Sequence, residues 1–122
     1  MRTQLQKRID SFRNAFCGIR HLLGSESHAR IHLVLSCAVI GTGLSLTISA
    51  VDWCLVSLAM GLVWTAEAMN TAIERLVDLY SPEQDILAGQ AKDLAAAAVL
   101  LTALVAVAVG LFVFLPRITA ML

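Results

Sequence analysis

The sequence predicts an all-α membrane protein, with one amphipathic helix followed by three transmembrane helices. Hydrophobic residues make up 58% of the 122 residues and charged residues 15%, against roughly 45–50% and about 25% in ordinary soluble domains. Long stretches carry no charge, and the charges that remain are gathered in a few segments. A soluble core of this size cannot bury so much apolar surface, so a lipid bilayer is the simplest surrounding for it.

The first predicted element is an amphipathic helix over about residues 5–23. Its apolar side chains recur at alternating intervals of four and three, which is the spacing of one helix face. Six of the nine Lys and Arg residues of the chain lie in the first thirty positions. A basic amphipathic helix beside an apolar segment is typical of the cytoplasmic membrane surface; the alternative is a soluble helix that packs on its own protein. The apolar residues are Leu5, Ile9, Phe12, Phe16, Ile19 and Leu23.

Three apolar runs predict the transmembrane helices, each long enough for the roughly 30 Å hydrocarbon core. A short turn at Asp52 is expected to follow the first run, with Trp53 as an interfacial anchor. Pro82 is expected to end the second run and Pro116 the third, because proline cannot continue a helix interior. The predicted spans cover about residues 31–51, 53–79 and 94–115.

We expect residues 1–122 to form a single domain, because the chain is of the length of one. Basic residues predict its orientation, since Lys and Arg are retained on the cytoplasmic side. The amino-terminal arm carries six of them, the first predicted turn none, and the carboxyl-terminal tail only Arg117. We therefore expect a multi-pass protein of the inner (cytoplasmic) membrane with its amino terminus inside. The amino-terminal segment lacks the apolar stretch of a cleaved signal peptide, so none is expected.

Cysteine and histidine spacings indicate neither a disulfide framework nor a zinc site. The three cysteines form no CxxC pair and are expected as small apolar packing residues. The histidines lack ligand spacing around a shared acid, so interfacial hydrogen bonding is expected of them. There is also no P-loop and no protein-kinase signature. The histidines are His21, His28 and His32.

One polar face of the second predicted span carries the candidate chemistry. Its four residues follow one another at intervals of three, four and four, so a helix places them together. The first of them is expected roughly 7 Å inside the cytoplasmic boundary at 1.5 Å per residue. A charge at the centre of a span costs about 2.5–3.5 kcal/mol or more, and such a residue marks function by default. The alternative is a set of hydrogen bonds that hold an oligomer together. The residues are Glu67, Asn70, Glu74 and Asp78.

Two further groups are weak signals on their own. Lys92 and Asp93 precede the third span, where an ammonium could neutralise phosphate. Glu26 precedes the first span and by itself is typical of a solvated surface acid. Phosphoryl transfer needs mainly positioning and charge neutralisation, magnesium prefers oxygen ligands, and a carboxylate at the depth of a lipid hydroxyl can act as a base. The sequence holds all these parts, although the chemistry alone does not single out a kinase.

Four groups of short motifs, spread along the chain, occur together. They are Ser11-Phe12 with Gly18-Ile19, Glu26 with Arg30-Ile31-His32, Ala66-Glu67-Ala-Met-Asn70-Thr-Ala-Ile-Glu74 with Val77-Asp78, and Ala91-Lys92-Asp93 with Ala97 and Val99. In this combination the chain resembles the small bacterial integral-membrane diacylglycerol kinase and undecaprenol kinase family. The likeness covers about residues 7–115, and the third group is the most specific of the four.

The resemblance implies an ATP-dependent lipid kinase of bacterial lipid metabolism, with Mg²⁺ as cofactor. It also implies a homotrimer whose active sites are shared between neighbouring subunits. The acceptor would be undecaprenol or diacylglycerol, and the product undecaprenyl phosphate or phosphatidic acid. The run Arg30-Ile31-His32 and the ending Phe112–Pro116 lean modestly towards undecaprenol.

The resemblance further implies roles for individual residues. Glu67 would be the general base, and Glu26 and Glu74 would hold the metal ion and touch the nucleotide. Other family members carry different residues at several nucleotide positions, so the nucleotide preference stays open. The supporting residues would be Asn70, Asp78 and Arg30, and the remaining nucleotide contacts Lys7, Asn14, Glu83, Gln84, Asp85, Lys92 and Asp93.

Two other classes of function stay open from the residues alone. A small oligomeric transporter would place its key acid near the middle of the bilayer, whereas the acids here cluster towards the cytoplasmic side. A non-catalytic membrane subunit would tolerate Glu67→Gln without loss of activity and respond only in the stability of its oligomer.

Overall fold

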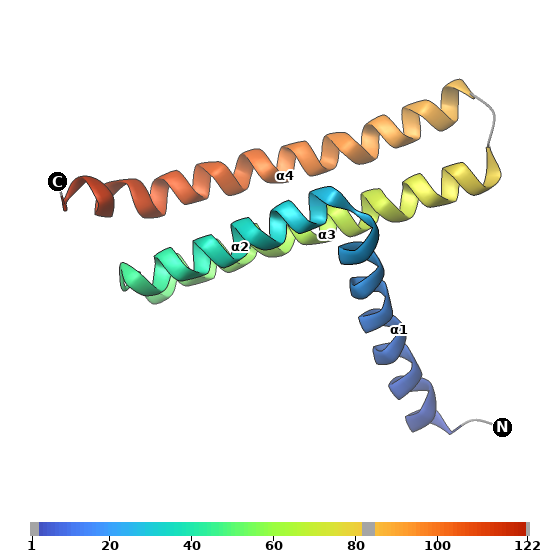
Figure 1. Cartoon of the computed structure of the whole chain (residues 1–122), viewed down its shortest axis with the longest axis horizontal. Coiled ribbons are helices and arrows are strands. Elements are labelled where there is room, and N and C mark those ends of the chain that lie inside the picture. Colours follow the sequence, from blue (N-terminus) through green and yellow to red (C-terminus); the bar gives the residue numbers. More distant parts are fainter. Residues whose placement is uncertain (1–2, 82–84, 122) are drawn as a thin grey trace.

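The computed structural model describes residues 3–81 and 85–121, which form four α-helices and no strand. Helices α3 and α4 form a long antiparallel hairpin, α2 lies along the first part of α3, and α1 projects away from the other three (Figure 1). We call the end where α2 joins α3 the turn end, and the opposite end, where α3 leads into α4, the loop end. The helices are α1 (Gln4–Ser25), α2 (Ser27–Ser45), α3 (Ala50–Tyr80) and α4 (Ile86–Thr119).

Helix α1 begins at a capping box. The Thr3 hydroxyl accepts the backbone N–H of Gln6 at 3.3 Å, and the Gln6 side chain accepts the N–H of Thr3 at 2.9 Å, which satisfies two donors at the helix start. The helix extends two residues beyond the predicted end. Its apolar stripe stays exposed over most of its length, as at Phe12 and Phe16. A stripe of this kind needs lipid or another subunit to cover it.

The turn between α2 and α3 lies earlier than predicted, so the prediction of a turn at Asp52 was wrong. Helix α2 ends at Ser45, and Asp52 lies in the first turn of α3. The reason is a second capping box, in which the Ser49 hydroxyl accepts the Asp52 N–H at 3.2 Å and Asp52 Oδ2 accepts the Ser49 N–H at 3.1 Å. Thr47 completes the turn in the left-handed region, with φ of 47°.

The tightest packing of the described residues lies at the turn end. Ile48, Val56 and Val113 form a buried cluster, and Val113 is fully buried. Trp53, expected as an interfacial anchor, packs against this cluster. A Cβ at Gly43 would lie 2.9 Å from the Trp53 ring, so the indole can lie on α2 only because this position is glycine. The cluster holds α2, α3 and α4 together at this end.

Helix α4 also continues beyond its predicted end, and the prediction that Pro116 stops it was wrong. The helix runs through Pro116 to Thr119. Proline lacks the N–H that would donate to the carbonyl of Phe112, and its ring crowds that carbonyl, but only a single turn of helix follows it. The Ala120 N–H donates to the Pro116 carbonyl at 3.2 Å, so the last turn keeps a backbone hydrogen bond of its own.

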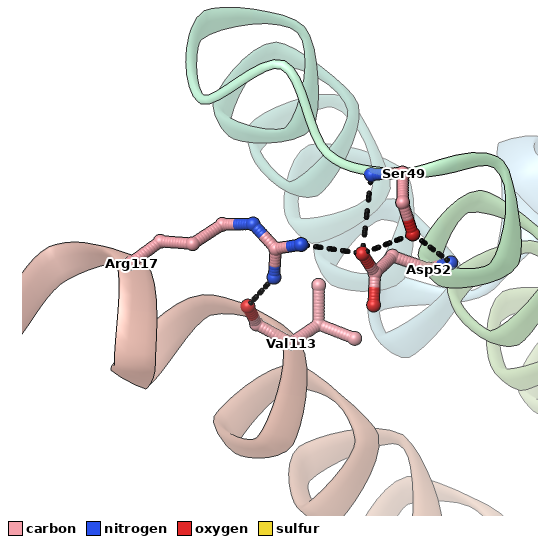
Figure 2. A network of polar contacts seen from close by, with 4 residues as sticks. All are labelled: Ser49, Asp52, Val113 and Arg117. Atoms are coloured by element: carbon pink, nitrogen blue, oxygen red, sulfur yellow. Dashed lines mark hydrogen bonds and ion pairs between the residues drawn. The ribbon is translucent and has the colours of Figure 1, made fainter.

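An ion pair joins α3 to α4 at the turn end (Figure 2). The Arg117 guanidinium donates to Asp52 Oδ2 and to the carbonyl of Val113. The same carboxylate oxygen accepts the Ser49 hydroxyl at 2.6 Å. One carboxylate therefore caps the start of α3 and holds the end of α4.

We expect the Asp52 and Arg117 side chains to stabilise the protein jointly without affecting its activity. Arg117→Ala should lower the thermal unfolding temperature of the purified protein in detergent by a few degrees, because it leaves Asp52 without its α4 partner. Asp52→Ala should have a similar effect, and the double variant should lose no more than the larger single loss. Additive losses would show that the two side chains act independently.

Two of the described helices, α3 and α4, are long and apolar enough to cross a membrane. They contain 31 and 34 residues, about 46 and 51 Å at 1.5 Å per residue, so both exceed the roughly 30 Å hydrocarbon core. Large apolar side chains such as Leu100, Leu104 and Leu111 are exposed along α4. Exposure of this kind fits a lipid surrounding. Helix α2 carries His28 and Arg30 in its first turn.

Candidate active site

The polar stripe predicted on the second span lies on α3, and its exposure rises towards the loop end. Glu67 is 4% exposed, whereas Asp78 is exposed. Asn70 and Glu74, between them, are partly buried. Glu67 precedes Asp78 by eleven residues, about 16 Å along the helix at 1.5 Å per residue. The stripe therefore leads from the interior of the helices to the surface.

Glu67 is the most buried charged side chain among the described residues, and its partner lies on another helix. Glu67 Oε1 is 3.0 Å from Nε2 of His32 on α2. The sequence predicts only general interfacial hydrogen bonding for His32 and does not reveal this contact. The available signal was the position of His32 inside the first predicted span, where an unpaired imidazole is costly.

Asn70 and Glu74 pair one turn nearer the loop end. Asn70 Nδ2 donates to Glu74 Oε1 at 3.0 Å, the spacing expected of neighbours four apart on a helix. In the part of the chain that the structure describes, Asn70 Oδ1 is buried without a hydrogen-bond donor. Because a buried unpaired oxygen costs about 1–3 kcal/mol, this atom is suited to accept a donor or a cation from outside the chain.

Glu26 lies at the break between α1 and α2 and faces α3. Its Oε1 accepts the Ser25 hydroxyl at 3.0 Å and lies 3.6 Å from Nη2 of Arg75. Arg75 also donates to the Ser25 hydroxyl, so it ties the α1–α2 junction to α3 next to Glu74. Within residues 3–81 and 85–121, no group of three or more His, Cys, Asp or Glu side chains of this chain is arranged to hold a metal ion. The metal roles of Glu26 and Glu74 stay predictions.

At the loop end Lys92 joins α4 to the stripe. Lys92 Nζ donates to Asp78 Oδ1 at 2.8 Å, so the predicted nucleotide residue and the predicted supporting residue lie together. Asp85 accepts the N–H groups of Leu87 and Ala88 at 2.8 and 3.0 Å and thereby caps α4.

The other predicted site residues lie apart from the stripe or are not described. No polar contact joins Lys7, Asn14 or Arg30 to α3 in the described structure, and all three side chains are exposed. Asp93 is exposed next to Lys92. Glu83 and Gln84 lie outside the described residues.

These features define a small helical membrane protein with a buried carboxylate, from which one helix face leads to further side-chain oxygens and an ammonium. The family described as prokaryotic diacylglycerol kinase matches residues 13–114, and the chain belongs to this family. The predicted family and the predicted class of enzyme, a lipid kinase, are confirmed.

Two relatives match nearly the whole chain. An undecaprenol kinase of Bacillus subtilis (strain 168) is 35% identical over 117 residues, which cover 96% of this chain and 95% of that protein. A diacylglycerol kinase of Synechocystis sp. is 37% identical over 113 residues, which cover 92% of this chain and 65% of that protein.

Proposed function

We propose that this chain transfers the γ-phosphoryl group of ATP to the hydroxyl group of undecaprenol, with diacylglycerol as the second candidate acceptor. The observation that carries the proposal is the buried Glu67 carboxylate inside an apolar helix bundle. The order of the acceptors rests on coverage, because the undecaprenol kinase relative is matched over 95% of its length and the diacylglycerol kinase relative over 65%.

Glu67 is suited to act as the general base of this transfer. The hydroxyl of a membrane lipid lies near the membrane boundary, where a carboxylate inside the span can contact it. A base in open water could not contact the hydroxyl at that depth. A positioned base contributes about 10²–10⁴-fold to a rate. Burial keeps water from competing with the lipid as acceptor.

An apolar groove supports a lipid acceptor. It has a volume of about 370 Å³ between α2, α3 and α4 and is lined almost entirely by apolar side chains, among them Met60, Val63 and Val107. His32, the partner of Glu67, borders it. An acceptor chain lying in this groove would bring its terminal hydroxyl to the Glu67 carboxylate.

The oxygens nearer the loop end are suited to magnesium and nucleotide. Glu26 and Glu74 would hold the ion, together with the unpaired Asn70 oxygen, because magnesium takes carboxylate and amide oxygens. The bound ion would offset charge on the phosphates. Lys92 would give up its contact with Asp78 for one with the nucleotide and so neutralise a further phosphate charge. Lys7, Asn14, Asp85 and Asp93 are proposed nucleotide contacts.

We also propose the arrangement in the membrane. Helices α2, α3 and α4 would be the three spans and α1 would lie on the surface. Six basic residues in the first thirty positions favour a cytoplasmic amino terminus and loop end in the inner membrane of a bacterium. Three copies would share sites between neighbours, and the exposed apolar stripe of α1 supports this proposal because another subunit could cover it.

The test is transfer of labelled phosphate from [γ-³²P]ATP to lipid by the purified protein in detergent with Mg²⁺. Undecaprenol and diacylglycerol are offered separately. We expect label in undecaprenol at the higher kcat/KM. Label only in diacylglycerol would make diacylglycerol the acceptor in place of undecaprenol. Label in neither lipid, with folded protein, would refute the proposal.

A further inference from the structure

His32 is the polar side chain that the described residues bring to the Glu67 carboxylate. The Nε2–Oε1 distance is 3.0 Å, and the two side chains are 20% and 5% exposed. Because a buried carboxylate without a hydrogen bond is costly, this contact decides which way the Glu67 carboxylate points.

A second polar contact keeps the imidazole opposite the carboxylate. Trp64 Nε1 donates to the Ser36 hydroxyl at 3.1 Å. Ser36 follows His32 by one turn of α2, and Trp64 precedes Glu67 by one turn of α3, as antiparallel helices require. Two contacts one turn apart fix both the rotation and the height of α2 against α3.

Resting on the proposed function, we infer that His32 is a positioning residue for Glu67. In this role Nε2–H, with its nitrogen 3.0 Å from Oε1, would donate to that oxygen, fix the carboxylate rotamer and leave Oε2 to take the proton of the acceptor hydroxyl. This role requires the tautomer that carries hydrogen on Nε2.

The transfer then balances without a second proton carrier. The O–H bond of the lipid breaks while its oxygen bonds to the γ-phosphorus. The bond from that phosphorus to the bridging oxygen of ATP breaks, ADP leaves with the electron pair, and the proton stays on Glu67. His32 orients the base throughout and keeps its own hydrogen.

A pair of substitutions at His32 tests the inference through kcat and KM. Leucine removes the donor, and we expect kcat to fall about 10–100-fold, because small misplacement of a reacting group has effects of this size. KM for lipid and for ATP should stay within about two-fold, since a positioning residue acts on the reacting geometry and not on uniform binding. Glutamine places an amide N–H near the position of Nε2 and should restore most of kcat. The matched control is His28→Leu, at an exposed position on the same helix, which should leave kcat unchanged.

Three results would overturn the inference. His32→Leu with wild-type kcat would show that the contact does not serve the reaction. Equal loss in His32→Leu and His32→Gln would assign the effect to the imidazole ring instead of a donor. A rise in KM alone would assign His32 to lipid binding.

A measurement independent of activity separates this inference from the proposed function. The imidazole ¹⁵N signals of the three histidines can be assigned by removing each in turn. We expect the His32 signals to report hydrogen on Nε2 and to shift in Glu67→Leu, while those of His21 and His28 stay. Unmoved His32 signals would refute the contact even if the kinase is active. A wild-type protein that transfers phosphate to no lipid would refute the proposed function and, with it, the positioning role of His32. The ¹⁵N measurement would still decide whether His32 contacts Glu67.

Discussion

Glu67→Gln is expected to lower kcat for lipid phosphorylation by about 10²–10⁴-fold, the usual contribution of a general base. The amide has nearly the shape of the carboxylate and its oxygen can still accept from His32, so the helix packing should be kept. What it loses is the ability to take the proton of the lipid hydroxyl. The measurement is the initial rate of lipid phosphorylation at saturating ATP.

Thr71→Val is the matched control for this prediction. Thr71 is the other buried polar residue among those described and lies one turn along α3, and valine has nearly its shape. We expect its kcat to stay within about three-fold of wild type, because the change removes only a hydroxyl that has no part in the proposed reaction. If Glu67→Gln keeps kcat in the same range while the oligomer becomes less stable, Glu67 is structural and the chain fits a non-catalytic subunit.

Glu74→Gln is expected to lower activity by about 10²-fold or more at the magnesium concentration that saturates the wild type, an effect of the size seen when one stabilising group is removed from an active site. The substitution keeps an oxygen for Asn70 Nδ2 to donate to, but it removes the negative charge that favours a divalent cation. The dependence of rate on Mg²⁺ concentration is the measurement, and the half-saturating concentration should rise.

The control removes a carboxylate at the opposite end of the same helix. Asp52→Asn should leave the half-saturating Mg²⁺ concentration unchanged, because Asp52 lies at the turn end, about 33 Å along α3 from Glu74 at 1.5 Å per residue. An unchanged Mg²⁺ dependence in Glu74→Gln would refute a role of Glu74 as a metal ligand.

The helices and the stripe of Glu67 could be predicted because both rest on local spacing. An interval of three or four places residues on one helix face whatever surrounds the helix. Helix ends were predicted less well, because they depend on single contacts. Ser49 and Asp52 start α3 through a reciprocal cap, and α4 continues past Pro116 to a last turn in which the Ala120 N–H donates to the Pro116 carbonyl.

The place of His32 in the first predicted span indicates that it needs a polar partner, but the partner itself could not be predicted. Which residue of α2 faces Glu67 depends on the height and rotation of α2 against α3, and His32 and Glu67 lie 35 residues apart in sequence. That register is fixed by the Ser36–Trp64 contact and the packing of Trp53 on Gly43. Neither leaves a periodic signal in the sequence.

The two ion pairs between α3 and α4 have a consequence for the bilayer around the protein. Asp52–Arg117 and Asp78–Lys92 bridge the hairpin at positions 26 residues apart on α3, about 39 Å along a helix of 1.5 Å rise. The hydrocarbon core is only roughly 30 Å thick, so the distance between the two ion pairs exceeds the thickness of that layer. Such mismatch is relieved by tilt or by local thickening of the lipid. In the proposed membrane arrangement, α3 and α4 would tilt together because both ends are bridged, and the depth of Glu67 below the headgroups would follow the thickness of the membrane.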